Sequence, residues 1–152
     1  MMIKMKSVVA GVALSVIALA SSAGEFNESN GVAIKGYDPV AFFKDSKPVR
    51  GKDDLRFEYK GSTFVFANAE NRAAFAADPA KYAPQYGGYC AFGTARGYKA
   101  DIDPATFTVI DGRLYLNYNT QVQREWTADS GKFIRQADER WPTVSKTDKV
   151  IR

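Results

Sequence analysis

Alternating apolar and polar residues predict two β-hairpins in the chain. The predicted strands are Leu55–Tyr59 and Thr63–Ala67 in the first hairpin, and Phe107–Ile110 and Arg113–Asn117 in the second. Lys60-Gly61-Ser62 joins the first pair and Asp111-Gly112 joins the second. Asp-Gly is a strong hairpin signal because a tight two-residue turn needs positive φ at both positions.

Capping residues and prolines place short helices around these hairpins. The predicted helices are a short one with Asp38 as N-cap and Pro39 first, Ala69–Ala77 capped by Asn68, Ala80–Tyr82, Tyr89–Ala95 ended by Gly97, Gln121–Ala128 capped by Thr120, and Lys132–Trp141 ended by Pro142. Residues 24–30 are expected to form a loose leader, Val32–Lys35 a short strand, residues 45–54 a surface loop and residues 143–152 a charged tail. No internal repeat and no second domain are evident. The order of elements predicts a single α+β domain, a small antiparallel sheet of hairpins packed with short helices.

The N-terminal residues have the pattern of an export signal. Lys4 and Lys6 precede an apolar run, Ser7–Ala20, which is too short for a comfortable membrane span. Ser21-Ser22-Ala23 supplies the small residues of a cleavage site. We therefore expect a signal peptide over residues 1–23, a mature chain over residues 24–152 with no membrane span, and a periplasmic or secreted location.

Composition excludes several classes of function. The net charge of +4 falls to +2 without Lys4 and Lys6, and no basic run indicates a nucleic-acid partner. The chain has no histidine, and its three methionines all lie in the first five residues. A nucleophile with a histidine base, a haem attachment motif and a Cys/His zinc cluster are therefore ruled out. No haem or nucleotide cofactor is expected.

The single cysteine, Cys90, is the main candidate for chemistry. It ends the stretch Tyr86-Gly87-Gly88-Tyr89-Cys90, in which two glycines allow a tight turn. A helix beginning near Tyr89 would place the thiolate at a positive helix end and lower its pKa. Cys90 is thus the candidate catalytic and metal-ligating residue. The alternative is that Cys90 is a buried, inert core residue, as free cysteines often are.

Aromatic residues gather in sequence around the glycine pair. Most aromatic side chains in a small domain belong to the core, and this interpretation is favoured over a ligand platform. The candidate binding residues are Tyr37, Asp38, Tyr86, Gly87, Gly88, Tyr89 and Cys90.

Several of these segments together resemble the YHS domain family, in its secreted branch of YHS domain-containing (seleno)proteins. The matching segments are Gly36–Phe43, Tyr59–Ala67, Asn71–Pro79, Tyr82–Ala91 and Val109–Asn117. Metal-associated members carry Asp-Pro-Val-Cys and further cysteines after the hairpin, whereas this chain has Ala41 and Ala67 there. The resemblance therefore does not carry a metal role over to these positions. Cys90 resembles the selenocysteine position of some members, which implies a redox-active chalcogen in those relatives.

These observations lead to one expected function and two alternatives. We expect an exported, non-catalytic binding module with a metal- or redox-linked role at Cys90, an envelope protein or thiol compound as partner, and a transition-metal ion as the candidate cofactor. The first alternative is a thiol-dependent oxidoreductase that uses Cys90 with an external resolving thiol, since the chain has no second cysteine. The second is a structural or interaction module in which Cys90 is buried.

Overall fold

The computed structural model describes residues 4, 7, 9–13, 15 and 24–152, so the predicted cleavage point after Ala23 lies outside the described residues. The strands are β1 Glu28–Ser29, β2 Val32–Ala33, β3 Lys52–Tyr59, β4 Ser62–Phe66, β5 Lys99–Ala100, β6 Asp103–Ile110, β7 Arg113–Asn117 and β8 Val150–Ile151. The helices are α1 Ala41–Lys44, α2 Ala69–Ala77, α3 Pro79–Tyr82, α4 Ala91–Arg96, α5 Thr120–Ala128 and α6 Ser130–Val144, with 3₁₀ turns η1 Ile34–Gly36 and η2 Gln85–Gly88. None of the described helices has the length and apolarity to cross a lipid bilayer.

The strands pair two by two. β1–β2, β3–β4 and β6–β7 are antiparallel, and β5–β8 is parallel. The turn of the first long hairpin has φ of 49° at Lys60 and 77° at Gly61, and that of the second has 50° at Asp111 and 72° at Gly112. Both predicted hairpins and the α+β class are therefore confirmed, through turns in which both central residues have positive φ.

The hairpin and the helix that follows it occur twice. Residues 57–78 correspond to residues 108–129 at a constant shift of 51, so that hairpin turns, caps and helix ends coincide. Asn68 caps α2 by accepting the Asn71 N–H at 2.8 Å, and Asn119 caps α5 by accepting the Val122 N–H at 2.9 Å. The expectation of no internal repeat is therefore wrong: the described chain contains two versions of one unit.

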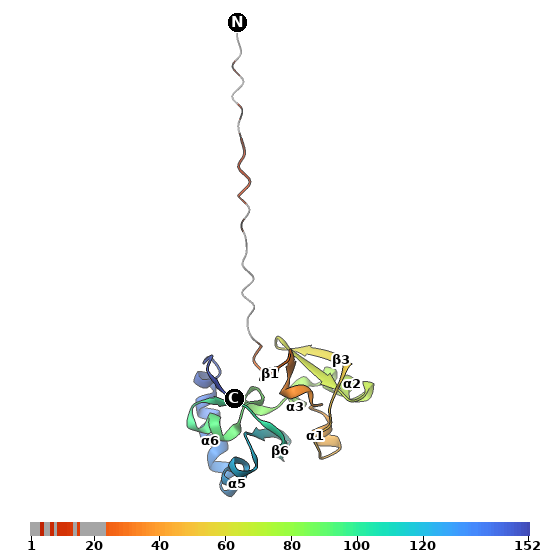
Figure 1. Cartoon of the computed structure of the whole chain (residues 1–152), viewed down its shortest axis with the longest axis vertical. Helices are drawn as coiled ribbons and strands as arrows, with labels where there is room; N and C mark the ends of the chain where they lie inside the picture. The colour runs from red at the N-terminus through yellow and green to blue at the C-terminus, as the bar shows by residue number, and fades with distance from the viewer. Residues whose placement is uncertain (1–3, 5–6, 8, 14, 16–23) are drawn as a thin grey trace.

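Each version of the unit has its own buried aromatic side chain. Phe75 in α2 and Trp126 in α5 occupy corresponding positions, and both are fully buried. Figure 1 shows α1, β3 and α2 on one side of the molecule and β6, α5 and α6 on the other. The first half is therefore built around Phe75, and the second around Trp126.

The two halves meet at two left-handed turns. Over Ile34–Gly36 φ rises from 44° to 77°, and over Tyr86–Gly88 it rises from 55° to 72°. The predicted strand over Val32–Lys35 consequently ends at Ala33. A Cβ on Gly88 would lie 2.6 Å from Ile34 Cγ2, so glycine is required there both by its backbone angle and by this close packing.

The N-terminal segment is better ordered than predicted. Within the expected loose leader, Phe26 and Asn27 are buried, and the Asn27 N–H donates to the Gly87 carbonyl at 2.7 Å. Phe26 packs edge-on against Phe64, with ring centroids 5.0 Å apart. The buried Phe26 ring and the backbone hydrogen bond of Asn27 therefore hold this segment in place. It was predicted to be loose because its residues are small and polar.

Several helix and strand boundaries differ from the predicted ones. The cap of α5 is Asn119, one residue before the predicted Thr120. Pro142 lies inside α6, because the Ser145 N–H still reaches the Trp141 carbonyl at 2.7 Å beyond it. The predicted charged tail instead contributes β8, whose Val150 pairs with Lys99 of β5. The short first and fourth helices begin two residues later than predicted, at Ala41 and Ala91, and β3 begins within the predicted loop, at Lys52.

Replacement of Gly88 by alanine tests the contact between the turns. Gly31→Ala is the matched control, because φ at Gly31 is 77° but nothing lies within 4 Å of its Cβ position. We expect Gly31→Ala to lower the free energy of unfolding by about 1 kcal/mol, and Gly88→Ala by about 2–4 kcal/mol because of the added clash. Urea unfolding measures both, and equal losses would show that the contact with Ile34 contributes nothing.

Candidate functional site

The predicted site residues do not form one cluster but lie in three places. Tyr37 and Asp38 follow the first left-handed turn, Tyr86 and Gly87 line a cleft between the halves, and Cys90 lines a separate cavity. Gly88 packs on Ile34, and Tyr89 packs beside Trp141 with ring centroids 6.3 Å apart. The stretch Tyr86–Cys90 connects the second and third places.

Asp38 has a structural role in the first half. Its carboxylate is fully buried and accepts the N–H groups of Val40 at 2.8 Å and Ala41 at 3.2 Å. Asp38 therefore binds the N–H of the first residue of α1, but the N-cap of this helix is Val40 and not Asp38 as predicted. It also accepts the Ala67 N–H at 2.9 Å and the Asn71 side-chain amide at 2.8 Å. With four donors the carboxylate has no free position for a ligand.

Tyr37 lies at the surface beside this carboxylate. Its ring is half-buried, and the Arg50 guanidinium stands over it at 5.0 Å from the centroid. The backbones of Tyr37 and Arg50 also form an isolated antiparallel β-bridge. Tyr37 therefore holds the chain at the start of α1 and does not face the cleft.

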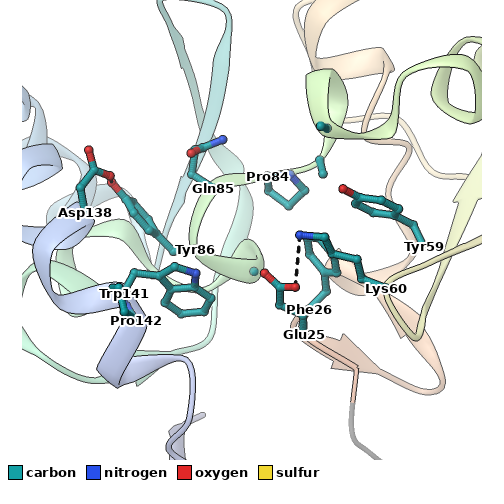
Figure 2. Close-up of a pocket in the computed structure, with 13 residues that line it drawn as sticks. Glu25, Phe26, Tyr59, Lys60, Pro84, Gln85, Tyr86, Asp138, Trp141 and Pro142 are labelled. Atoms are coloured by element: carbon teal, nitrogen blue, oxygen red, sulfur yellow. Dashed lines mark hydrogen bonds and ion pairs between the residues drawn. The ribbon is translucent and has the colours of Figure 1, made fainter.

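The cleft between the two halves has a volume of about 300 Å³. Its residues include Glu25, Phe26, Tyr59, Lys60, Pro84, Tyr86, Gly87, Asp138 and Trp141. Figure 2 shows Tyr86 and Trp141 on one side, and Tyr59 and Lys60 on the other. These residues come from the N-terminal segment, the first hairpin, η2 and α6, which brings both halves of the chain to one surface hollow.

Each charged side chain of the cleft is paired with another residue of the cleft. Lys60 Nζ lies 3.4 Å from a Glu25 carboxylate oxygen, and Tyr86 Oη donates to Asp138 at 2.9 Å. Burial raises the pKa of Tyr86 well above its ordinary value, and the hydrogen bond to Asp138 raises it further. Tyr86 therefore stays protonated and holds α6 against η2.

The Cys90 thiol is almost completely buried. It precedes α4, where its sulfur accepts the Gly93 N–H at 3.4 Å and donates to Asn117 Oδ1 at 3.5 Å. Burial raises the thiol pKa, although backbone N–H groups of Gly93, Tyr118 and Phe92 oppose this effect. The predicted lowering of the pKa by a helix end is therefore wrong, because desolvation outweighs a helix of only six residues.

The surroundings of Cys90 do not fit a metal ion. The side-chain group that hydrogen-bonds to the sulfur is the Asn117 amide, whose oxygen also accepts the Phe92 N–H at 3.1 Å. Among the described residues, no group of three or more His, Cys, Asp or Glu side chains is arranged to hold a metal ion. A thiol with one amide oxygen lacks the charged ligands that transition metals take in proteins.

The cavity beside Cys90 has a volume of about 260 Å³ and is mostly apolar. Phe92, Tyr98, Tyr118, Val122 and Ile151 are among the residues that line it with Cys90. Ile151 belongs to the C-terminal strand β8, which pairs with β5. The last residues of the chain therefore form part of the wall next to the thiol.

Asp101 fastens this C-terminal strand to the first half. Its backbone N–H donates to the Ile151 carbonyl at 2.7 Å, and its carboxylate lies 3.2 Å from Lys35 Nζ and 3.8 Å from an Arg152 nitrogen. Asn27 also donates to this carboxylate at 3.1 Å. The sequence around Asp101 indicates only a turn or cap residue. Its role as a fastening point could not be predicted, because its partners come from opposite ends of the chain.

Sequence reasoning also missed most of the cleft. Tyr59 was expected only on the face of a hairpin, and Trp141 only at the end of a helix. A pair of half-buried aromatic residues on two such elements gives no signal until the fold brings them together.

The chain matches no protein-family model, no curated protein and no solved structure.

Alkylation of Cys90 tests the buried thiol. We expect iodoacetamide to react much more slowly with the native chain than with the chain in urea, and its pH midpoint to be higher in the native state, because burial disfavours the thiolate. The remaining thiol is measured by mass spectrometry at each pH. A native midpoint below that of the unfolded chain would instead mark an activated thiolate.

Acid should remove the stabilisation contributed by Asp101. Burial raises the pKa of this carboxyl, but hydrogen bonds from Ile102, Asn27 and Lys35 outweigh it, so the folded-state pKa lies below the ordinary 3.8. The stabilisation is therefore present above pH 3.8 and is lost as the pH falls through the lower folded value. We expect Asp101→Asn to lower the Tm by about 2–6 °C near pH 7.

The difference between this variant and the unsubstituted chain should vanish toward about pH 2, which thermal unfolding at several pH values measures. Asp54→Asn is the control, because Asp54 is exposed. A difference that stays constant with pH would mean that the carboxylate charge is irrelevant.

Proposed function

We propose that this protein is a non-catalytic binding module whose ligand occupies the cleft between its two halves. The observation that carries the proposal is the cleft itself, an aromatic-walled hollow of about 300 Å³ that neither half forms alone. Such a volume is at the small end of the range for ligand pockets.

The exported location and membership of the YHS family remain part of the proposal. The location rests on the N-terminal pattern, and the family membership rests on segments such as Tyr82–Ala91.

The walls favour a small ligand with a planar apolar body. Tyr59 and Trp141 are half-buried, so part of each ring is exposed to an occupant, whereas Tyr86 is almost fully buried. Pro84 adds a further apolar surface between them (Figure 2). A flat ring placed between Tyr59 and Trp141 would bury apolar area on both of its faces.

The charges favour a cationic group on that ligand. The charged side chains of the cleft are Glu25, Asp138 and Lys60, which gives a net charge of −1. Lys60 is already paired with Glu25, and Asp138 with the Tyr86 hydroxyl. An added ammonium group gains from the carboxylates and from the Trp141 ring, whereas Lys60 Nζ already stands over the Tyr59 ring at 5.6 Å from its centroid.

The environment of Cys90 gives no support to the oxidoreductase alternative. An attacking thiol must be accessible as its thiolate, whereas the sulfur of Cys90 is buried and its pKa is raised by that burial. The described neighbours that contact the sulfur include no group able to act as a general base. We therefore propose the cleft, and not Cys90, as the binding site.

Three probes of the same shape and different charge test the proposal. Benzylamine, benzyl alcohol and benzoate are titrated into the protein, and binding is followed by NMR shifts of the Gly87 amide and the Trp141 indole N–H, which lie at the cleft. We expect benzylamine to bind most tightly and benzoate least, because the net charge of the lining is negative. Trp141→Ala should weaken benzylamine binding at least about tenfold.

Trp126 provides the matched control for this experiment. It is the only other tryptophan in the chain and is fully buried away from the cleft, so its indole signal should not move. Equal shifts at both tryptophans, or benzylamine binding that survives Trp141→Ala, would show that the cleft is not the ligand site.

A further inference from the structure

Both tryptophans and three of the eight tyrosines form a continuous series of neighbouring rings, called here the Tyr/Trp row. Trp126 lies 5.4 Å from Tyr115, and Tyr115 lies 6.0 Å from Tyr86, between ring centroids. Tyr86 in turn lies 6.1 Å from Trp141, and Tyr89 lies 6.3 Å from Trp141. Every member of the row is therefore a side chain that can lose a single electron, which a phenylalanine does far less readily.

The row leads from the core to the cleft. Trp126 is fully buried, Tyr115 is 2% exposed and Tyr86 is 5% exposed. Trp141 is half-buried and lines the cleft together with Tyr86. Figure 2 shows Tyr86 and Trp141 on the same side of the cleft, with the Tyr86 hydroxyl directed toward Asp138. The row thus connects a ring enclosed in the core with rings at a surface hollow.

The first half has phenylalanine where the row has tyrosine and tryptophan. Phe64 and Phe75 correspond to Tyr115 and Trp126 at the constant shift of 51, and their ring centroids lie 4.9 Å apart. Two phenylalanines therefore fill this place in the repeated unit with the same kind of ring contact. Tyrosine and tryptophan differ from them in their polar atoms and in the ease with which they lose an electron.

Trp126 carries a structural disadvantage that phenylalanine would not have. Its indole nitrogen is buried and has no hydrogen-bond partner among the described residues. A buried donor without an acceptor lowers stability. Phe75 fills the corresponding position without such an atom and is also fully buried. Packing alone therefore does not account for a tryptophan at this position, whereas electron transfer requires an oxidisable ring there.

Tyr86 has a proton acceptor in place. Its hydroxyl donates to Asp138 Oδ1 at 2.9 Å, and Asp138 is exposed to solvent. A phenol that loses an electron becomes a strong acid, so an oxidised tyrosine gives its proton to a carboxylate within hydrogen-bond distance. Tyr86 also lies between the two tryptophans of the row, beside Trp141 and one ring away from Trp126.

We propose that Tyr86 is a one-electron redox site at the cleft, and that the Tyr/Trp row carries oxidising equivalents to it. This activity goes beyond ligand binding and does not require an occupant in the cleft. The oxidant is a small oxidising radical in solution, which meets the row at the half-buried Trp141. The row draws the radical away from the core and holds it where a small electron donor removes it.

Each step of this reaction moves one electron. The oxidising radical takes an electron from Trp141 and becomes an anion, which leaves Trp141 as a radical cation. Trp141 then takes an electron from Tyr86 while the Tyr86 hydroxyl proton passes to Asp138, so Trp141 is restored and Tyr86 becomes a neutral phenoxyl radical. A donor of the phenol or enediol class returns one electron to Tyr86, and Asp138 returns the proton. The protein ends unchanged.

Pulse radiolysis of the full-length chain with azide radicals tests the transfer to Tyr86. Each azide radical takes one electron and becomes azide, and the absorbance bands of tryptophan and tyrosine radicals are followed separately. We expect the tryptophan radical to decay as a tyrosine radical appears, at a rate independent of protein concentration, and ascorbate to remove the tyrosine radical. Tyr86→Phe should slow the transfer at least about tenfold, because Trp141 loses the neighbour whose proton has an acceptor.

Tyr89→Phe is the matched control. Tyr89 also neighbours Trp141, but the Lys99 ammonium stands over its ring at 5.1 Å, so we expect the rate to be kept. Asp138→Asn retains the shape of the Tyr86 partner without the base, and should slow the transfer although Tyr86 is present. Thermal unfolding confirms that each variant is folded. An unchanged rate in Tyr86→Phe or Asp138→Asn, an equal loss in Tyr89→Phe, or a rate that rises with protein concentration overturns the proposal.

The buried part of the row is tested in Trp141→Phe, which leaves Trp126 as the only tryptophan. A laser flash ejects an electron from Trp126, and dissolved nitrate captures it. We expect the Trp126 radical to decay as a tyrosine radical appears, and Tyr115→Phe in the same background to slow this decay at least about tenfold. Equal rates with and without the Tyr115 hydroxyl would show that the row is not a path from the core.

Discussion

Ile34 and Gly88 lie against each other where the two left-handed turns pack, and a Cβ on Gly88 would approach Ile34 Cγ2 to 2.6 Å. Because one turn leads into α1 and the other toward α4, this contact sets how the halves sit against each other. The stretch that begins at Tyr86 in the cleft ends at Cys90 in the second cavity. Both hollows therefore depend on a left-handed turn that only a glycine-rich sequence adopts at low cost.

The repetition explains why one half is closed and the other offers sites. In the first half the Asp38 carboxylate uses its oxygens on four donors, and nothing remains to be recognised. In the second half a thiol, which is a weak acceptor, accepts the Gly93 N–H at 3.4 Å, and the Phe92 N–H donates to Asn117 Oδ1 instead. The extended helix α6 belongs only to the second half, where it supplies Asp138 and Trp141 to the cleft. Equivalent backbones thus carry different chemistry because a few side chains differ.

Local signals allowed much of this fold to be predicted. The Asp111-Gly112 turn and the Asn68 cap act within a few residues, so the sequence around them is sufficient to identify them. The repeat was missed because the paired core residues differ in type, as Phe66 and Asn117 show. Ile34 was assigned to a strand because β-branched residues favour strands, whereas packing forces it to a φ of 44°. The cleft was missed because its walls lie far apart in the chain.

The balance of donors and acceptors gives the physical reason why the second half is the more adaptable one. A buried polar group without a partner lowers stability locally, and the unpartnered nitrogen of Asn117 lies beside Cys90. The wall of that cavity includes the two-residue strand β8, which is held largely through Asp101. Segments with so few contacts open at lower free energy than the core around Phe75. The unpartnered amide nitrogen of Asn117 and the short strand β8 therefore belong to the same region of the second half.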